Sequence, residues 1–124
     1  MKERKTILII EQEVNLANGL RAILENEGYA IVCAFEHSRL QELFRAHSLD
    51  LAIINIYTPK ELGLNIVRNM RQHFPSLPIV AMTVYSNSFT KGELRDFGVN
   101  EFISKPFEVD CLKEMIERLL CGPQ

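Results

Sequence analysis

The stretch DLAIINIYTP, residues 50–59, joins a run of aliphatic residues to an asparagine and a proline. Its apolar part, Leu51–Ile54, is short and rich in aliphatic side chains, which is typical of a strand buried on both faces of a parallel sheet. Asn55 follows the run directly, and Pro59 and Gly63 punctuate the segment beyond it. The pattern predicts a central strand that ends on an uncharged amide.

Apolar runs of the same kind recur along the chain and predict the other strands of one sheet. They are Ile7–Ile10, Ala30–Cys33, Ile79–Met82 and a weaker run at Glu101–Ile103. Between them, apolar residues recur at helical spacing within residues 16–24, 40–44, 64–74 and 112–119. Five uninterrupted strand–helix units predict an α/β fold, a five-stranded doubly wound parallel sheet with helices on both faces.

The interval Asn87–Phe97 differs from the other predicted helices because few of its residues are apolar. Gly92 lies inside it, and a glycine costs about 1 kcal/mol relative to alanine in a helix interior. We therefore expect the fourth helix to be the most loosely packed element. Gly28 follows the apolar positions of the first helix and is expected to end it.

Length and composition restrict the class of protein. With 124 residues, 47% of them hydrophobic and 24% charged, we expect one soluble domain over residues 1–121, and a tail or the start of a linker at 122–124. A net charge of −2 predicts no direct nucleic-acid binding, and no apolar run is long enough to span a membrane. Three cysteines without a close pair favour a reduced, cytoplasmic setting without a disulfide framework or a zinc site.

Polar side chains follow the predicted strands at the edge where open parallel sheets bind their ligands. Glu11 and Gln12 follow the first strand, and Asn55 follows the third. Thr83 follows the fourth strand and Lys105 the fifth. Because the carboxyl ends of parallel strands meet at one edge, these side chains are expected to converge on one site.

These residues, in this order, resemble the receiver domain of bacterial two-component response regulators. The resemblance covers essentially the whole chain, and the matching positions are Glu11, Gln12, Asn55, Pro59, Gly63, Thr83, the segment Phe97–Phe102 and Lys105-Pro106-Phe107. It implies a flavodoxin-like sheet with strand order 2-1-3-4-5. It also implies that an aspartate at position 55 takes a phosphoryl group from a histidine kinase or a small acyl phosphate, while that aspartate and an acidic pair hold Mg²⁺.

The resemblance assigns roles to the remaining strand-end residues as well. Lys105 and Thr83 correspond to the residues that bind phosphoryl oxygens, and Thr83 with Phe102 corresponds to the family's switch pair. The Lys105–Pro106 bond is expected to be cis, as the family implies. Without a phosphate to drive the switch, Phe102 is expected to be a half-buried ring fixed in one conformation.

Two departures fall on the residues that carry the family's chemistry. Asn55 replaces the aspartate, and an amide nitrogen cannot form an acyl phosphate. Gln12 leaves one carboxylate, that of Glu11, where the family has three, so Mg²⁺ binding is expected to be weak or absent. Val84 is a milder departure, because its β-branched side chain would narrow the entrance to the site where the family has a small residue. The chain is therefore predicted to be a degenerate receiver, a pseudo-receiver without cofactor or enzymatic activity.

Two interpretations of the site stay open. Asn55 is interpreted as an amide that satisfies buried backbone groups at a strand end, or as part of a retained signalling role, and the two interpretations are compatible. Lys105 is expected to pair with Glu11 and hold the cleft together, or else to remain solvated.

The leading functional hypothesis is a phosphorylation-independent interaction module. Its protein partner would be a histidine kinase, an output domain, another receiver or a second copy of the chain. The expected docking face comprises the fourth helix, fifth strand and fifth helix, with Phe89, Lys91, Glu93, Asp96, Glu101 and Arg118. The alternatives are a phosphorylatable receiver that uses an unexpected acceptor with Mg²⁺, and a small-molecule sensor that uses the same cleft.

Overall fold

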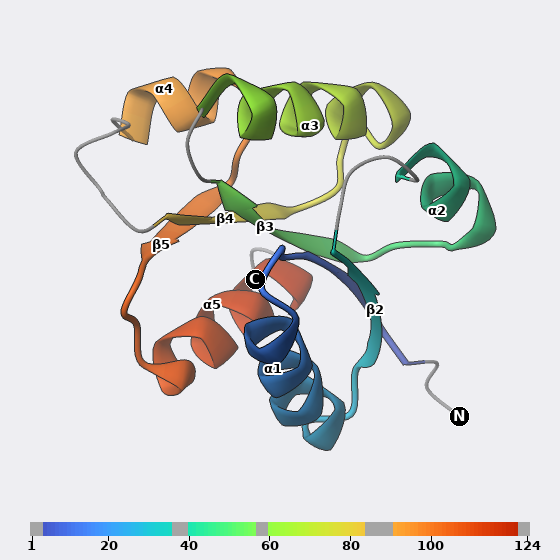
Figure 1. Ribbon diagram of the computed structural model, residues 1–124, viewed down its shortest axis with the longest axis vertical. Coiled ribbons are helices and arrows are strands. Elements are labelled where there is room, and N and C mark those ends of the chain that lie inside the picture. Colours follow the sequence, from blue (N-terminus) through green and yellow to red (C-terminus); the bar gives the residue numbers. More distant parts are fainter. Residues whose placement is uncertain (1–3, 36–39, 57–59, 84–90, 122–124) are drawn as a thin grey trace.

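The computed structural model describes residues 4–35, 40–56, 60–83 and 91–121, without the side chains of residues 60–62 and 91. Strands and helices alternate along this part of the chain (Figure 1). The strands are β1 (Thr6–Ile10), β2 (Ala30–Ala34), β3 (Leu51–Ile56), β4 (Ile79–Thr83) and β5 (Glu101–Ser104). The helices are α1 (Val14–Asn26), α2 (Leu40–Ala46), α3 (Lys60–His73), α4 (Lys91–Asp96) and α5 (Val109–Cys121).

The strands form a single parallel sheet in the order β2-β1-β3-β4-β5. This confirms the predicted fold class and strand order. The third strand continues two residues beyond the predicted run, because Asn55 pairs with Met82 and Ile56 with Thr83 in the ladder to β4. Asn55 is therefore the second-last residue of β3, and its backbone is paired with the neighbouring strand β4.

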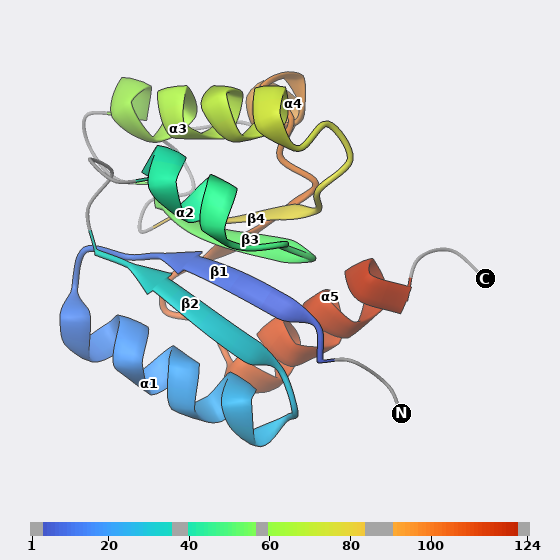
Figure 2. The same ribbon diagram turned by 90° about the vertical axis from the view of Figure 1, so that its right-hand side faces the viewer.

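Helices cover both faces of the sheet, as Figures 1 and 2 show, with α1 and α5 on one face and α2, α3 and α4 on the other. Alternate residues of each strand supply the two apolar cores. Ile7 and Ile9 of β1 pack with the α1–α5 side, whereas Leu8 and Ile10 pack with the α2–α3–α4 side. This two-sided burial explains why the strands appear in the sequence as continuous apolar runs.

Two positions in the fold require glycine, one because of its backbone conformation and one because of close packing. Gly28 has a φ of 100°, which favours glycine, and it follows the last residues of α1 as predicted. At Gly63 of α3, a Cβ atom would lie 2.9 Å from Cγ2 of Ile56. The missing side chain lets α3 approach the end of β3 closely, beside the residue that follows Asn55.

The fourth helix was predicted over residues 87–97, but α4 comprises only Lys91–Asp96. Residues 87–90 lie outside the described part, and Phe97 follows the helix. The C-terminal boundary has a local cause, since Gly98 has a φ of 103° and its N–H bonds to the carbonyl of Arg95. In the described ranges, no helix is long and apolar enough to cross a membrane.

Candidate functional site

Three polar side chains are buried in the described part of the chain, and all three lie at the carboxyl edge of the sheet. Glu11 follows β1 and is 1% exposed, Asn55 in β3 is 7% exposed, and Thr83 ends β4 and is 2% exposed. Most buried polar side chains need hydrogen-bond partners inside the protein. Their common position therefore marks this edge as the candidate site.

The amide of Asn55 connects two of the predicted site residues. Its Nδ2 donates to Oε2 of Glu11 at 3.0 Å and to Oε1 of Gln12 at 3.1 Å. Among the described residues Asn55 thus bonds to side chains, and no bond to the strand-end backbone is seen there. The reason is that the ladder to β4 already engages the local backbone, while Glu11 offers an ionised acceptor within reach.

Lys105 brings the fifth strand into the same network. Its Nζ donates to Oε1 of Glu11 at 2.8 Å, and the lysine side chain is 18% exposed. The backbone N–H of Glu13 donates to the other oxygen, Oε2, at 3.1 Å. The predicted Lys105–Glu11 pair is confirmed, and the peptide bond between Lys105 and Pro106 is cis as expected. We call Glu11, Gln12, Asn55, Thr83 and Lys105 the strand-end cluster.

The strand-end cluster is close to electrically neutral. One carboxylate, one ammonium and two amides meet there, and both oxygens of Glu11 already accept hydrogen bonds. Within the described ranges, Asn55 Oδ1, Gln12 Nε2 and Thr83 Oγ1 are buried without a hydrogen-bond partner. The cluster therefore offers unused donors and acceptors but no second carboxylate.

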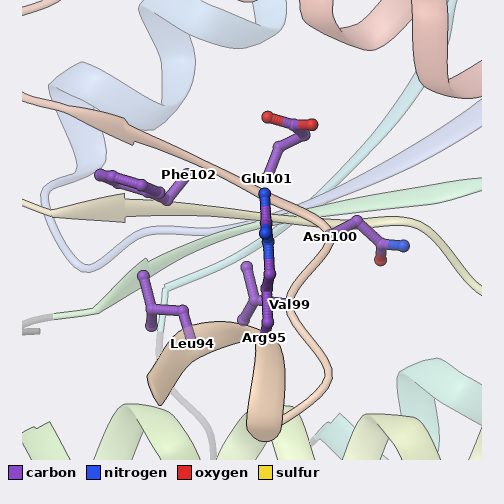
Figure 3. Close-up of a pocket in the computed structure, with 6 residues that line it drawn as sticks. All are labelled: Leu94, Arg95, Val99, Asn100, Glu101 and Phe102. Carbon is purple, nitrogen blue, oxygen red and sulfur yellow. The ribbon is translucent and has the colours of Figure 1, made fainter. Parts of the chain in front are cut away.

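The predicted switch residue Phe102 lies on β5. It is half-buried, as expected, and packs against the α2–α3–α4 core. With Leu94, Arg95, Val99, Asn100 and Glu101 it lines a small hollow of about 110 Å³ at the junction of α4 and β5. Figure 3 shows the Glu101 carboxylate directed away from α4, while Leu94 rises from the helix toward the side where Phe102 lies. Val84 lies outside the described residues.

The predicted docking face is described in part. Glu93 and Asp96 are exposed on α4, and Arg118 of α5 is exposed beside Glu101 of β5, 3.7 Å between Nη2 and Oε2. Phe89 and the side chain of Lys91 lie outside the described residues. The face therefore carries charges of both signs on three neighbouring elements.

Sequence reasoning missed the polar network at the opposite edge of the sheet, which centres on Arg71 of α3. Its guanidinium donates to the carbonyls of Phe74, Pro75, Leu77 and Gly98 and to Oδ1 of Asn100. These acceptors are mostly backbone groups, which leave no mark on residue type. At Gly98 a Cβ atom would lie 3.0 Å from Nε of Arg71, a close approach that only the folded structure reveals.

Comparison with known proteins identifies relatives along almost the whole chain. The family model of the response regulator receiver domain matches residues 7–117. The transcriptional regulatory protein DltR of Streptococcus agalactiae is 30% identical over 113 residues, which cover 91% of this chain and 49% of DltR. The response regulator ArlR of Staphylococcus haemolyticus is 33% identical over 114 residues, which cover 92% of this chain and 52% of ArlR. The chain thus spans about half the length of these curated relatives.

A solved structure agrees in sequence and in fold. The response regulator TrrA of Thermotoga maritima, determined in complex with Mg²⁺-BeF, has a TM-score of 0.80 and 30% sequence identity to this chain. The alignment covers 94% of this chain and 99% of TrrA. Together with the family match and the sheet order, these findings show that the chain belongs to the response regulator receiver domain family.

Proposed function

We propose that this receiver domain acts by phosphorylation-independent protein–protein interaction, as a pseudo-receiver. The observation that carries the proposal is the bond from Asn55 Nδ2 to the Glu11 carboxylate. At the position where the family has its phosphoryl acceptor, this side chain is a hydrogen-bond donor. Its nitrogen lone pair is delocalised into the carbonyl, so it cannot attack a phosphoryl group. On this basis we assign the chain no enzymatic step.

The donor set of the strand-end cluster supports the same proposal, because it does not fit Mg²⁺. This ion prefers several oxygen ligands, carboxylates above all, in strict octahedral geometry. Glu11 is the one carboxylate in the cluster, and Lys105 and Asn55 already occupy its two oxygens. A cation would have to displace an ammonium 2.8 Å from the carboxylate, so we infer that Mg²⁺ is not held here.

The proposed mode of action is docking through the face formed by α4, β5 and α5. The Glu101–Arg118 pair joins β5 to α5, and Asp96 adds an exposed charge on α4. Such a charged, mixed face suits recognition by a complementary protein surface, whose charges set orientation more than affinity. The partner would be a histidine kinase, an output domain, another receiver or a second copy.

The first experiment is intact-mass analysis after incubation with a small acyl phosphate and Mg²⁺. We expect no phosphoryl adduct on the wild type. The Asn55→Asp variant, and above all the Asn55→Asp, Gln12→Asp double variant, restores carboxylates and should gain the adduct. An adduct on the wild type would refute the proposal and favour an unexpected acceptor.

The docking mode is tested by sedimentation velocity over a range of protein concentrations. If a second copy is the partner, the wild type self-associates and Arg118→Glu weakens this association. Arg45→Glu makes the same charge change at an exposed position of α2, outside the proposed face, and serves as the matched control. Equal effects of the two variants would contradict docking through this face.

A second candidate function has one observation in its favour, the three unpartnered polar atoms of the strand-end cluster. A small polar molecule that donates to Asn55 Oδ1 and accepts from Gln12 Nε2 would give hydrogen-bond partners to two of these three atoms. Binding to the native state alone raises the melting temperature. A screen of small amides and polyols by thermal unfolding, with Asn55→Leu as control, tests this. A shift retained in Asn55→Leu would place the ligand elsewhere.

A further inference from the structure

The two faces of the sheet differ in charge. Helices α3 and α4 carry five Lys and Arg residues against three Asp and Glu residues, whereas α1 and α5 carry three against four. The chain as a whole has a net charge of −2. The excess of positive charge on the α3–α4 side is therefore a local feature that overall composition does not explain.

Arg71 contributes a fixed positive charge on that side. Its guanidinium is half-buried and bonds to four backbone carbonyls and to the amide oxygen of Asn100. Burial lowers the pKa of Arg71, yet arginine remains protonated in proteins. All of these acceptors are neutral, and no carboxylate in the described ranges pairs with it. Its charge is therefore compensated by carbonyl and amide oxygens, which leave the net positive charge in place.

Two further arginines flank Arg71 at the surface. The guanidinium of Arg68 lies over the ring of Phe97, 5.3 Å from its centroid, which restricts the side chain. Arg95 of α4 is exposed. Neither forms an ion pair among the residues whose side chains are described. We call Arg68, Arg71 and Arg95 the arginine shelf.

The arginine shelf is hollowed on both sides of Arg71. One hollow, of about 370 Å³, lies between α3 and α4 and is lined by Arg68, Arg71, Gln72, Asp96 and Phe97. The other, of about 440 Å³, is lined by Arg71, Pro75, Ser76, Arg95, Gly98, Val99 and Asn100. Figures 1 and 2 both show α3 and α4 side by side, and the two hollows adjoin each other at Arg71. Arg71 lines both hollows, and each contains one further arginine.

We propose that the arginine shelf docks an acidic segment of a partner protein. Guanidinium groups bind carboxylates in planar, charge-assisted pairs, and Arg68 and Arg95 are available to form them. One acidic side chain would pair with Arg95 in the hollow that has no acidic lining residue. A second would pair with Arg68, where Asp96 partly opposes it, and both would lie near the charge of Arg71. Nucleic acid fits less well, because three arginines with Asp96 among them form a small basic footprint on an acidic chain.

This surface is distinct from the strand-end cluster. It extends the proposed function beyond the α4–β5–α5 face, with which it shares α4 and Asp96. Arg71 bonds to Leu77 and Asn100, which precede β4 and β5, so the shelf lies at the amino edge of the sheet. The strand-end cluster lies at the carboxyl edge. Docking at the shelf therefore requires no change at Asn55.

The test uses a fluorescein-labelled oligoglutamate peptide and measures its binding to the full chain by anisotropy at low salt. We expect the Arg68→Gln, Arg95→Gln double variant to weaken binding by about five- to tenfold, because two exposed charge pairs with the peptide are lost. Arg21→Gln removes an arginine on α1 and should leave the dissociation constant unchanged. Arg71 is retained in every variant because its bonds hold the α4–β5 connection, and thermal unfolding confirms that each variant is folded.

Two results would overturn the proposal. Binding that is unchanged in the double variant, or weakened equally by Arg21→Gln, would show that the arginine shelf does not recognise the acidic peptide. An unlabelled DNA oligonucleotide that displaces the peptide at lower concentration, with the same dependence on Arg68 and Arg95, would assign the surface to nucleic acid instead. Loss of binding confined to the shelf variant, with weak competition by DNA, supports it.

Discussion

At the scale of single residues, Asn55 decides what the strand-end cluster can do. An amide and a carboxylate have nearly the same shape, but the amide presents a donor where the carboxylate presents an acceptor. Here that donor bonds to the side-chain oxygens of Glu11 and Gln12 at 3.0 and 3.1 Å, so the amide matches the acceptors that surround it. The same positions with an aspartate at 55 would place two carboxylates against each other.

The Lys105–Glu11 pair should matter for stability, because one partner is almost fully buried. Lys105→Met leaves the Glu11 carboxylate without its cation, and we expect a loss near the lower end of about 3–5 kcal/mol in the free energy of unfolding. Lys113→Met is the matched control, since both side chains of the Lys113–Glu27 pair are far more accessible, 33% and 41%, and the pair should contribute about 1 kcal/mol or less. Urea unfolding measures both, and equal losses would contradict the assignment.

Cysteine reactivity should follow burial. Cys33 was expected in the strand core and is half-buried on β2, where desolvation raises the pKa of its thiol and Arg21 opposes the shift only in part. The reactive species is the thiolate, so a raised pKa lowers its reactivity at neutral and mildly alkaline pH.

We expect iodoacetamide to modify the exposed Cys111 and Cys121 before Cys33, as followed by peptide mass spectrometry. The rate at Cys33 should rise only as the pH approaches its raised pKa. In concentrated urea the three rates should converge. Equal rates in the folded protein would show that Cys33 is not protected.

At the scale of elements, two helical glycines have opposite surroundings. A Cβ atom added at Gly19 of α1 meets nothing within 4 Å, whereas one added at Gly63 of α3 lies 2.9 Å from Ile56. Alanine is favoured over glycine within a helix by about 0.5–1 kcal/mol. The intrinsic gain is therefore the same at both positions, and the packing differs.

Gly19→Ala is expected to stabilise the fold by about 0.5–1 kcal/mol. Gly63→Ala should destabilise it by about 1–3 kcal/mol, because α3 must move away from β3. Chemical denaturation of the two variants beside the wild type gives both values. A stabilising Gly63→Ala would mean that the contact with Ile56 relaxes easily.

The elements differ in how far the sequence predicts them. The strands are buried on both faces, so their apolar runs mark them to within one or two residues, and Gly28 marks the end of α1. The Lys105–Glu11 pair could be predicted from the sequence because both residues follow strands that end at one edge. The Arg71 network could not be predicted, because its partners are mainly carbonyls that folding brings together. The short α4 ends where Gly98 adopts a positive φ, a choice that the weak apolar pattern around Gly92 did not reveal.

At the scale of the whole molecule, two polar networks close the two edges of one sheet. The strand-end cluster links β1, β3 and the segment after β5, and the Arg71 bonds link α3 to the segments before β4 and β5. Between them, β3 is buried along its full length. Docking is therefore confined to the helices and to the sheet edges, which is where both proposed surfaces lie.

The Lys105–Glu11 bond joins residues 94 positions apart, so its formation closes most of the chain into one loop. Closing so long a loop is entropically costly, and contacts of this span tend to be made after the main folding barrier. We therefore expect Lys105→Met to accelerate unfolding while leaving the folding rate almost unchanged, as measured by stopped-flow chevron analysis. A slower folding limb would place the bond in the transition state. Otherwise the bond forms after the folding transition state. It then lengthens the lifetime of the native state without changing how fast the protein folds.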